Sequence, residues 1–529
     1  MNLAKARKWS QIVFFVLFLF LLLKTEFRGY LGVFKGDIRL PYPVSIFLEA
    51  DPLAAITNAL STGALYKGLL WSLVILIPTL FLGRFFCGWI CPLGSLHHFF
   101  SSLKSEKKRG IRRIDSNRWK RWQNLKYYIL IALLVSAVFG GGLAGVLDPI
   151  SLLVRSLALS VLPTLNYAVE SVFGISLLSF KQSYFRQGAF LGLLFVGIIA
   201  LNFWVTRLWC RAICPLGALL GLVSRRSILG IEKHASRCED CNRCLLHCQG
   251  GDDPIPGALW HKAECHLCFN CVSDCPEAGG IRFRFLPKGA TTIEAPDLQR
   301  RKAVTGFVAG VAALPLFRSA TGLKAEKDAR LVRPPGALDE KSVLARCVRC
   351  GECMKVCPNN ALHPAMAQAG FEGLWTPVLV PRVGYCEPSC TLCSQVCPTG
   401  AIWEITGADK GWSNSKAKSG SSPIRIGTAF CDRGRCLPWA MARECIVCEE
   451  WCPTSPKAIY LAPAEVKDAD GTSRSVRQPY VAPERCVGCG ACEYACPVLD
   501  RPAIYVTSIG ESRSRSNQFL LKRPRKGRA

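Results

Sequence analysis

Few side chains in this sequence are of the kinds that bind copper, since its 529 residues include four methionines and seven histidines. The motif C-x-x-C-H does not occur, so covalently attached c-type haem is not expected. No glycine-rich phosphate-binding motif stands out, and no constellation of acid, base and nucleophile accompanies the other motifs. These absences argue against a copper site and against a hydrolase or transferase.

Acidic residues are also few: 38 Asp and Glu stand against 66 Lys and Arg, a formal net charge of +28. A basic chain can bind nucleic acid. Here the cysteines would offset part of the charge if they bind metal, because a metal-bound thiol is deprotonated. The remaining basic residues gather where membrane topology places them. We therefore expect no nucleic-acid partner.

Cysteine, in contrast, is abundant, with 29 residues. In an extracellular protein so many cysteines could form a disulfide scaffold. Their cadence argues against this, because disulfide frameworks have no reason to repeat one spacing, whereas thiolate ligation explains the repetition directly. A Cys-Pro pair closes a short cysteine run at seven places: Cys91, Cys214, Cys275, Cys357, Cys397, Cys452 and Cys496.

The most informative stretch is Cys238–Cys275, where CEDCNRCLLHC and CHLCFNCVSDC each follow the spacing C-x2-C-x2-C-x3-C. A bacterial ferredoxin holds two 4Fe–4S clusters in this way, with three thiolates from one loop and the fourth from the other. Zinc sites, the alternative, usually have nothing regular between two C-x2-C pairs. Gln249 departs from the pattern, since a proline normally follows the fourth cysteine. The crossover assigns Cys238, Cys241, Cys244 and Cys275 to one cluster, and Cys265, Cys268, Cys271 and Cys248 to the other.

Apolar residues are concentrated in the first 210 positions, which predicts a membrane part followed by a soluble part. The loop Ser101–Lys126 has ten Lys or Arg against two acids, so the positive-inside rule places it in the cytoplasm. Lys24–Ala64 and Asp148–Gly188 then face outward. A signal peptide is the alternative for the first apolar segment, Trp9–Leu23, but no small-residue cleavage site follows it, so we expect a retained helix. The expected spanning helices are Trp9–Leu23, Leu65–Phe86, Tyr127–Leu147 and Ala189–Leu208.

The two hairpins made by these helices resemble each other. EADPLAAI and CGWICPLGSL in the first correspond to LDPISLLV and CRAICPLGAL in the second, which indicates an internal repeat. Spacing of i and i+4 would let one helix face present both thiols of each motif, and the four would converge at the inner boundary. They could hold a further cluster or metal, act as redox thiols or be small buried residues, and the duplication favours a functional role. His97 and His98 are either quinone or metal contacts or solvated loop residues. The four thiols are Cys87, Cys91, Cys210 and Cys214.

Arg300 and Arg301 precede a weakly hydrophobic, Gly/Ala-rich run, Ala303–Phe317. Paired arginines before such a run are typical of a twin-arginine export signal, which carries folded, cofactor-loaded domains. As a helix the run would span about 22 Å, against roughly 30 Å of hydrocarbon. We expect residues 297–323 to be such a signal or a fifth membrane segment, with an amphipathic surface helix as the alternative.

Four further cysteine loops follow, with enough cysteines for four more clusters. Spacing leaves open whether neighbouring loops pair, or the first pairs with the fourth and the second with the third. Cys431 is left over, and its position near Cys436 makes it an alternative ligand. The four loops are Cys347, Cys350, Cys353 and Cys357; Cys386, Cys390, Cys393 and Cys397; Cys436, Cys445, Cys448 and Cys452; and Cys486, Cys489, Cys492 and Cys496.

The expected fold combines three domains. Residues 1–226 are a four-helix membrane domain of two repeated hairpins, residues 227–290 an α+β bacterial-ferredoxin-like domain with two clusters, and residues 344–511 a four-cluster polyferredoxin domain. Residues 324–343 are expected to form a linker and residues 512–529 a disordered basic tail.

Residues 1 to about 285, with four predicted helices, twin C-x3-C-P motifs and a two-cluster ferredoxin, resemble the NapH-type membrane ferredoxins of periplasmic nitrate respiration, relatives of the NosR family. From about residue 297, the paired arginines and four cysteine loops, including RCLPWAMARECIVCEEWCP, resemble the NapG/MauM-type exported ferredoxins. The chain thus resembles a natural fusion of the two. The resemblance implies electron transfer from membrane quinol to a periplasmic acceptor, which makes the chain a candidate quinol dehydrogenase component.

Chains of clusters perform no bond chemistry on a substrate, so we expect an electron relay. Its cofactors are six 4Fe–4S clusters, and a seventh if the helix-end cysteines bind one. The expected partners are the quinone pool of a bacterial inner membrane and a periplasmic cytochrome c or reductase. The two-cluster domain is expected in the cytoplasm and the four-cluster domain in the periplasm. The alternative function is a metal-reducing or assembly factor for a respiratory metalloenzyme.

Overall fold

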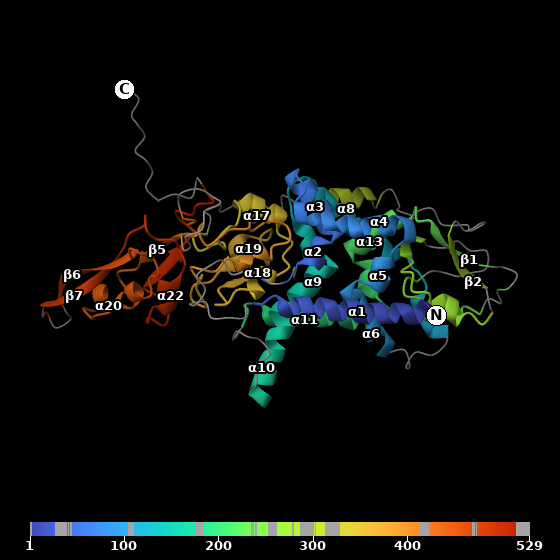
Figure 1. Cartoon of the computed structure of the whole chain (residues 1–529), viewed down its shortest axis with the longest axis horizontal. Coiled ribbons are helices and arrows are strands. Elements are labelled where there is room, and N and C mark those ends of the chain that lie inside the picture. The colour runs from blue at the N-terminus through green and yellow to red at the C-terminus, as the bar shows by residue number, and fades with distance from the viewer. Residues whose placement is uncertain are drawn as a thin grey trace, which may run out of the picture.

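The computed structural model has three parts in a row along its long axis, with a helical bundle in the middle, the strands β1 and β2 at one end and the C-terminal domain at the other (Figure 1). Cys238, Arg300 and most of the predicted basic tail lie outside the described residues, as does the middle of the predicted cytoplasmic loop. The structure describes residues 3–26, 40, 42, 45–103, 111–174, 184–233, 237, 241–251, 262–277, 280–285, 301, 303–312, 328–411, 423–467, 471 and 473–514.

Helix α1 (Leu3–Lys24) runs along one side of the bundle (Figure 1). Its 22 residues give a length of about 33 Å. Near its start, Arg7 Nη2 donates to Asn270 Oδ1 at 3.4 Å, and just beyond its end Thr25 O accepts from Lys355 Nζ at 2.8 Å. Helix α1 therefore contacts the β1–β2 end of the molecule with one end and the C-terminal domain with the other.

The rest of the bundle consists of short helices around a core that includes Leu53, Phe86, Tyr127 and Leu220. The elements are α2 (Ile46–Glu49), α3 (Pro52–Thr62), η1 (Lys67–Ser72), α4 (Leu73–Leu82), α5 (Phe85–Trp89), α6 (Pro92–Leu103), α7 (Ile111–Asn117), η2 (Arg121–Asn124), α8 (Leu125–Val138), η3 (Leu143–Val146), α9 (Pro149–Ser156), η4 (Leu157–Val161), α10 (Leu162–Phe173), α11 (Gly188–Ala200), η5 (Leu201–Phe203), α12 (Leu208–Ala212) and α13 (Pro215–Ser224).

Among the described residues, two helices are long and apolar enough to cross a membrane, Leu3–Lys24 and Pro149–Phe173. The first confirms the helix predicted at Trp9–Leu23. The second was not predicted, because its polar side chains lower its hydropathy, and we had placed Asp148–Gly188 in an outer loop. Most of α9 and η4 is buried within the protein.

The other three predicted spans are shorter than expected. Helix α4 ends at Gly83, whose φ of +96° lies in a region that L-residues rarely adopt, and Leu65–Phe86 is therefore interrupted. Helix α8 ends at Val138 before a run of glycines, and α11 ends at Ala200. A hydropathy average taken along the sequence does not detect such breaks in a helix. The predicted boundaries of these three spanning helices were therefore wrong.

The internal repeat is visible in how the helices begin. Asp51 caps α3 and Asp148 caps α9, and a proline follows each aspartate at the first helical position. The C-x3-C-P motifs also match, but their cysteines do not share one continuous helix face. A proline disfavours the α conformation in the residue before it. Cys91 and Cys214 therefore each lie at a break between two short helices.

At one end of the bundle, β1 (Leu229–Lys233) and β2 (Ile281–Phe285) pair antiparallel, with Leu229 opposite Phe285. The segment between them carries the first cysteine loops. It contains α14 (Arg243–Leu246), η7 (Lys262–Glu264) and α15 (Asn270–Asp274).

Its described residues give the C-terminal domain three two-stranded antiparallel sheets, β3 with β4, β5 with β8 and β6 with β7. These sheets and the short helices within the cysteine loops surround a core rich in cysteine. Its elements are α17 (Glu340–Arg346), α18 (Glu352–Lys355), β3 (Leu362–Pro364), η8 (Ala367–Ala369), β4 (Pro377–Leu379), α19 (Leu392–Gln395), β5 (Thr428–Cys431), α20 (Leu437–Ala440), α21 (Val447–Glu450), β6 (Ile459–Lys467), β7 (Ser473–Val481), α22 (Ala491–Ala495) and β8 (Ile504–Thr507).

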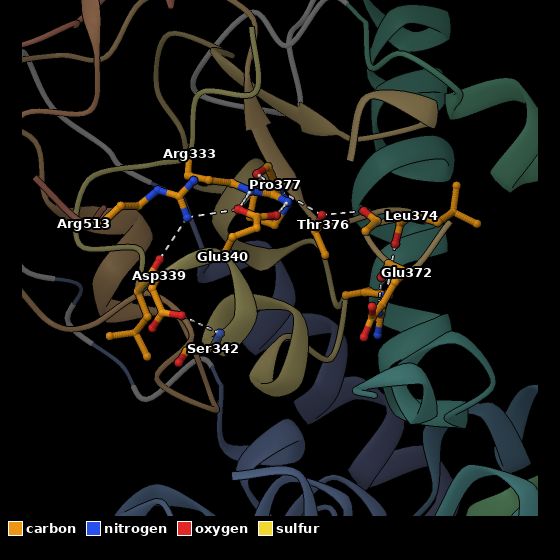
Figure 2. A network of polar contacts seen from close by, with 12 residues as sticks. Arg333, Asp339, Glu340, Ser342, Glu372, Leu374, Thr376, Pro377 and Arg513 are labelled. Carbon is orange, nitrogen blue, oxygen red and sulfur yellow. Dashed lines mark hydrogen bonds and ion pairs between the residues drawn. The ribbon is translucent and has the colours of Figure 1, made fainter. Parts of the chain in front are cut away.

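The described part of the predicted linker, residues 328–343, packs into this domain, because Val332 and Arg333 are buried. Arg333 Nη2 binds Glu340 Oε1 at 2.5 Å and its Nη1 donates to Thr376 Oγ1 at 2.8 Å. Arg513, close to the end of the described chain, also contacts Glu340, with Nη1 at 3.0 Å from Oε2 (Figure 2). Glu340 thus joins the first and last described segments of the domain.

The described part of the Gly/Ala-rich run forms a helix, Ala303–Ala312, which lies against α8. Its glycines allow close contact: a Cβ on Gly310 would lie 2.9 Å from the carbonyl oxygen of Ala132. The segment predicted as a signal or fifth membrane helix is therefore packed beside the bundle.

Candidate iron–sulfur cluster sites

The cysteine loops of the C-terminal domain pair with their neighbours in sequence. In each pair, the fourth cysteine of one loop lies with the first three of the other, as in the ferredoxin crossover. This resolves the pairing that spacing left open. Site 1 contains Cys347, Cys350, Cys353 and Cys397; site 2 contains Cys386, Cys390, Cys393 and Cys357; site 3 contains Cys436, Cys445, Cys448 and Cys496; and site 4 contains Cys486, Cys489, Cys492 and Cys452.

Backbone geometry turns the thiols inward. Gly351, between two cysteines of site 1, has φ +87°, and Gly490, between two cysteines of site 4, has φ +88°. Glycine adopts this left-handed conformation without steric cost. Backbone amides also approach sulfur: Ala361 N donates to Cys357 Sγ and Ile402 N to Cys397 Sγ, each at 3.4 Å. Such hydrogen bonds to ligand sulfurs are one of the ways in which a protein sets a cluster potential.

The burial of these thiols fits metal ligands. Burial raises the pKa of Cys390 and of Cys489 to about 12, so as free thiols they would be protonated at neutral pH. Coordination to iron deprotonates a thiol outright. Site 1 is closed off from water to a similar degree, since Cys350 is 7% exposed and Cys353 is 9% exposed.

Site 2 has a buried cation that sequence analysis did not single out. Lys410 Nζ lies 3.5 Å from Cys386 Sγ and donates to the carbonyl oxygens of Glu387 and Cys390 at 2.7 and 2.8 Å. Burial alone would lower the pKa of Lys410, but the surrounding cysteines raise it. Lys410 is therefore placed to offset the negative charge of a cluster at site 2.

Site 3 contains a fifth thiol. Cys431, the residue left over from the loop spacing, lines the same cavity as the four cysteines assigned to site 3. Its thiol donates a hydrogen bond to Cys436, which lowers the pKa of Cys436 and raises that of Cys431. This arrangement fits Cys436 as the ligand and Cys431 as a donor to its sulfur.

The β1–β2 end carries the loops predicted to hold two clusters. Cys248 lines a cavity with Cys265, Cys268 and Cys271, the set that the crossover predicts, and Cys244 of the other predicted set lines the same cavity. We call the set Cys248, Cys265, Cys268 and Cys271 site 5. Cys241, Cys244 and Cys275 of the other predicted set are described, while Cys238 is not. His266 also lines the site 5 cavity, and both its ring nitrogens lack a hydrogen-bond partner among the described residues.

The four helix-end thiols do converge. All are buried, and Cys214 interacts electrostatically with the other three. Each second thiol caps the following helix, since Cys91 Sγ accepts from Gly94 N at 3.4 Å and Cys214 Sγ from Gly217 N at 3.2 Å. We call this group of four cysteines the helix-end site. Of the two histidines beside it, His97 is fully buried against Asn202, and His98 contacts Arg7.

Two buried arginines, one from each repeat, hold the helix-end site together. Arg207 Nη1 donates to Cys87 O and its Nη2 to Gly94 O, both at 2.9 Å. Arg84 reaches the opposite way, and a Cβ on Gly217 would lie 2.9 Å from its Nη2. Each arginine therefore contacts the motif of the other repeat. The signal was present in the sequence as R-x2-C-x3-C-P-L-G, which occurs twice.

Charge around this region favours an anionic group. Several guanidinium nitrogens have no hydrogen-bond partner in the part of the chain that the structure describes, including Arg84 Nε, Arg207 Nε and Arg211 Nη1. Five buried basic side chains lie around the helix-end site and site 5, and three of them interact with the buried carboxylate of Glu264, which leaves an excess of four positive charges. Two clusters of roughly −2, at the helix-end site and site 5, would balance it. The five are Arg7, Arg84, Lys126, Arg207 and Arg211.

Comparison with known proteins supports these assignments. A family model described as a 4Fe–4S binding domain matches residues 65–112 and 187–232, which include both C-x3-C-P motifs. A 4Fe–4S dicluster domain model matches residues 346–401 and 442–499, which include every cysteine of the four C-terminal loops except Cys436. No solved structure matches the chain.

The ferredoxin-type protein NapG of Escherichia coli K12 is 34% identical over 222 residues, which cover 40% of this chain and 87% of NapG. The chain belongs to the NapG/MauM family. The methylamine utilization ferredoxin-type proteins MauM of Methylorubrum extorquens and Paracoccus denitrificans are 36% and 38% identical, over 80% and 72% of their lengths and 38% and 34% of this chain. This NapG/MauM-type chain is therefore an iron–sulfur, ferredoxin-type electron-transport protein that carries 4Fe–4S clusters.

Proposed function

We propose that this protein takes electrons from membrane quinol at a bacterial inner membrane and delivers them to a periplasmic redox partner. When bound, the clusters supply one-electron carriers, held by the cysteines of sites 1 to 5, by the set that includes Cys238, and by the helix-end site. The proposal deepens the family assignment, which by itself identifies neither the donor nor the acceptor. It also treats the N-terminal part as a NapH-type unit joined to a NapG/MauM-type unit.

Helix α1 is the observation that carries this proposal. Its length of about 33 Å matches a hydrocarbon core of roughly 30 Å. Because Arg7 contacts the β1–β2 end and Thr25 contacts the C-terminal domain, a membrane around α1 would separate the two groups of cluster sites. This supports a β1–β2 domain on the cytoplasmic side and a C-terminal domain on the periplasmic side.

Close contacts link the bundle to both groups of sites. At one end, Gly88, beside Cys87, packs so closely on His266 O that a Cβ would clash with it, and Trp89 Nε1 donates to Leu267 O at 3.0 Å. At the other end, Gly145 packs in the same way on the carbonyl oxygen of Val348, which lies between two cysteines of site 1. These contacts support site 5 as the neighbour of the helix-end site, and site 1 as the C-terminal site nearest the bundle.

Protease accessibility in spheroplasts tests the topology. We expect protease to remove an epitope placed after Ala529 and to spare one placed in the loop after Phe100. After lysis both epitopes should be cleaved, which controls for their intrinsic sensitivity. Replacing Arg300 and Arg301 with lysine should leave the C-terminal domain inside if a twin-arginine route exports it. A C-terminal tag that stays protected until lysis would place all sites in the cytoplasm and favour a soluble cytoplasmic partner.

Iron analysis and quinol reduction test the cofactors and the donor. We expect about 24 iron atoms per anaerobically purified chain, or about 28 if the helix-end site binds a cluster. Exchanging Cys87 and Cys210 for serine should then remove about four. Fewer than about 16 in the unsubstituted protein would contradict the proposal, as would clusters that dithionite reduces and quinol does not.

A further inference from the structure

The repeated Asp-Pro pairs place two carboxyl groups side by side in the interior. Asp51 Oδ1 accepts from Leu53 N at 2.9 Å, and Asp148 Oδ2 accepts from Ser151 N at 2.7 Å, so each aspartate caps its own helix. Asp51 is fully buried and Asp148 is 2% exposed. The two carboxyl groups interact directly, and Asp51 Oδ2 and Asp148 Oδ1 have no other partner among the described residues.

Two buried carboxyl groups this close cannot both be ionised, because two like charges would share a site of low dielectric. One proton shared between them removes this repulsion, and the positive charge of Arg155 favours the carboxylate that remains. Helix capping does not need this arrangement, since asparagine or serine would cap each helix equally well.

Arg155 connects the pair to site 1. Arg155 lies on α9, the helix that Asp148 caps. It interacts electrostatically with Asp148, Cys347 and Cys350. Its Nη1 donates to Arg349 O at 3.0 Å, between those two cysteines, while its Nε has no partner in the described part of the chain. The guanidinium also stacks 4.3 Å from the ring centre of Trp375. Arg155 thus interacts with the pair through Asp148, and it interacts with Arg349 on the side of the C-terminal domain.

We propose that the Asp51–Asp148 pair accepts a proton from quinol at the end of the bundle that contacts the C-terminal domain, next to the site that takes the electrons. Oxidation of one quinol to quinone releases two electrons and two protons. The electrons leave one at a time to iron at site 1, one proton enters the pair, and the second passes to water on the periplasmic side. This inference rests on the proposed quinol-dependent function. It gives the C-terminal domain an electron source that does not pass through the β1–β2 domain.

The test uses the full chain in lipid nanodiscs, loaded with clusters, and the variants Asp51→Asn, Asp148→Asn and both together. Asparagine keeps the helix caps and removes the proton acceptor. Asp339→Asn is the control, because Asp339 Oδ2 also caps a helix, α17, by accepting from Ser342 N at 3.2 Å, but it does so at the exposed surface. We expect the double variant to slow reduction by a quinol analogue at least about tenfold, with dithionite reduction, EPR signals and iron content unchanged.

Infrared spectroscopy gives a readout that does not depend on turnover. The protonated carboxyl band of the buried pair should disappear in the double variant and persist in Asp339→Asn. Wild-type quinol rates in the double variant would overturn the inference. A parallel loss of iron and of dithionite reduction would also overturn it, because the pair would then be structural. If quinol fails to reduce the wild-type protein, the proposed function itself fails.

Discussion

Arg207 Nη1 donates to the carbonyl oxygen of Cys87 at 2.9 Å, from the second half of the internal repeat to the first. Arg84 makes the reverse approach to the second motif, beside Gly217. The two C-x3-C-P motifs therefore fold as one unit. Arg207 donates hydrogen bonds to the backbone of the first motif, and Arg84 packs against the second. The arrangement also brings positive charge to the four thiols from both sides.

Replacing Arg207 should damage the helix-end site. Arg207→Met removes two buried hydrogen bonds from a charged donor, to Cys87 O and Gly94 O, at a cost of about 3 kcal/mol. We expect a lower thermal midpoint and, if the site binds a cluster, about four fewer iron atoms per chain. Arg226→Met, at an exposed position on the same segment, is the control. An unchanged midpoint and iron content in Arg207→Met would show that the crossing arginine is dispensable.

Serine variants should reveal the pairing of sites 1 and 2. Because Cys397 lies with the site 1 cysteines, Cys397→Ser should remove the same EPR signal as Cys347→Ser. Cys357→Ser should likewise match Cys386→Ser. Each variant should lose about four iron atoms. If Cys357→Ser instead matched Cys347→Ser, each loop would hold its own cluster and the crossover would be wrong.

Where ligand spacing is local, the sequence predicted which cysteines the fold brings together, and their assignment as cluster ligands stays a prediction. The repeated C-x2-C-x2-C-x3-C pattern was enough to anticipate that Cys248 joins Cys265, Cys268 and Cys271. It did not determine which C-terminal loops pair, because that depends on strands such as β5 and β8, which are distant in sequence and bring the third and fourth loops together. Lys410 was not anticipated for the same reason, since nothing near it in sequence indicates the thiol that it contacts.

The membrane helices were predicted less well than the cysteine sets. Hydropathy gave a continuous span at Leu65–Phe86, but the backbone at Gly83 ends the helix. It missed Pro149–Phe173 because a buried arginine and other polar side chains lie within that helix, and Arg155 donates to backbone carbonyls of the protein instead of water. Average hydropathy contains no information about such partners. The Asp-Pro repeat was visible, but the contact between its two aspartates depends on how the hairpins pack.

Cys431 should tune site 3 without binding its iron. Cys431→Ala should keep all iron and make the site 3 potential more negative, because a hydrogen bond to the sulfur of Cys436 is lost. A bond of about 1 kcal/mol corresponds to roughly 40 mV for a one-electron couple. Cys436→Ser should lose about four iron atoms. Redox-titrated EPR and iron analysis distinguish the two, and equal iron loss from both variants would make Cys431 a ligand.

Glu340 should stabilise the C-terminal domain at neutral pH. Burial alone would raise its pKa, but Arg333 and Arg513 lower it from 4.5 to about 2 (Figure 2). A shift of this size corresponds to about 3 kcal/mol. Because the pKa in the folded state is the lower one, this contribution is fully present above pH 4.5 and is lost as the pH falls towards 2.

Glu340→Gln should therefore lower the thermal midpoint of the full chain by the same amount at every pH from about 8 to 5. Glu444→Gln is the control, because Glu444 pairs with Arg477 at the surface, where both side chains are more than half exposed and solvent screens the pair. We expect little change in that variant. Equal effects of the two substitutions on the thermal midpoint would show that the buried network around Arg333 stabilises the domain no more than an exposed ion pair does.

Lys410 should raise the reduction potential of site 2. Its ammonium group is buried 3.5 Å from Cys386 Sγ, and a positive charge there favours the reduced cluster, which carries one more electron. Lys410→Met keeps most of the side-chain volume and removes the charge, so we expect a potential more negative by on the order of 100 mV, with iron content unchanged. Lys457→Met, which removes a half-exposed lysine paired with Glu449, should leave every potential unchanged. Redox-titrated EPR measures both variants. A site 2 potential that did not move in Lys410→Met would show that the backbone carbonyls of Glu387 and Cys390 already offset the lysine charge, and that its role is to hold the loop.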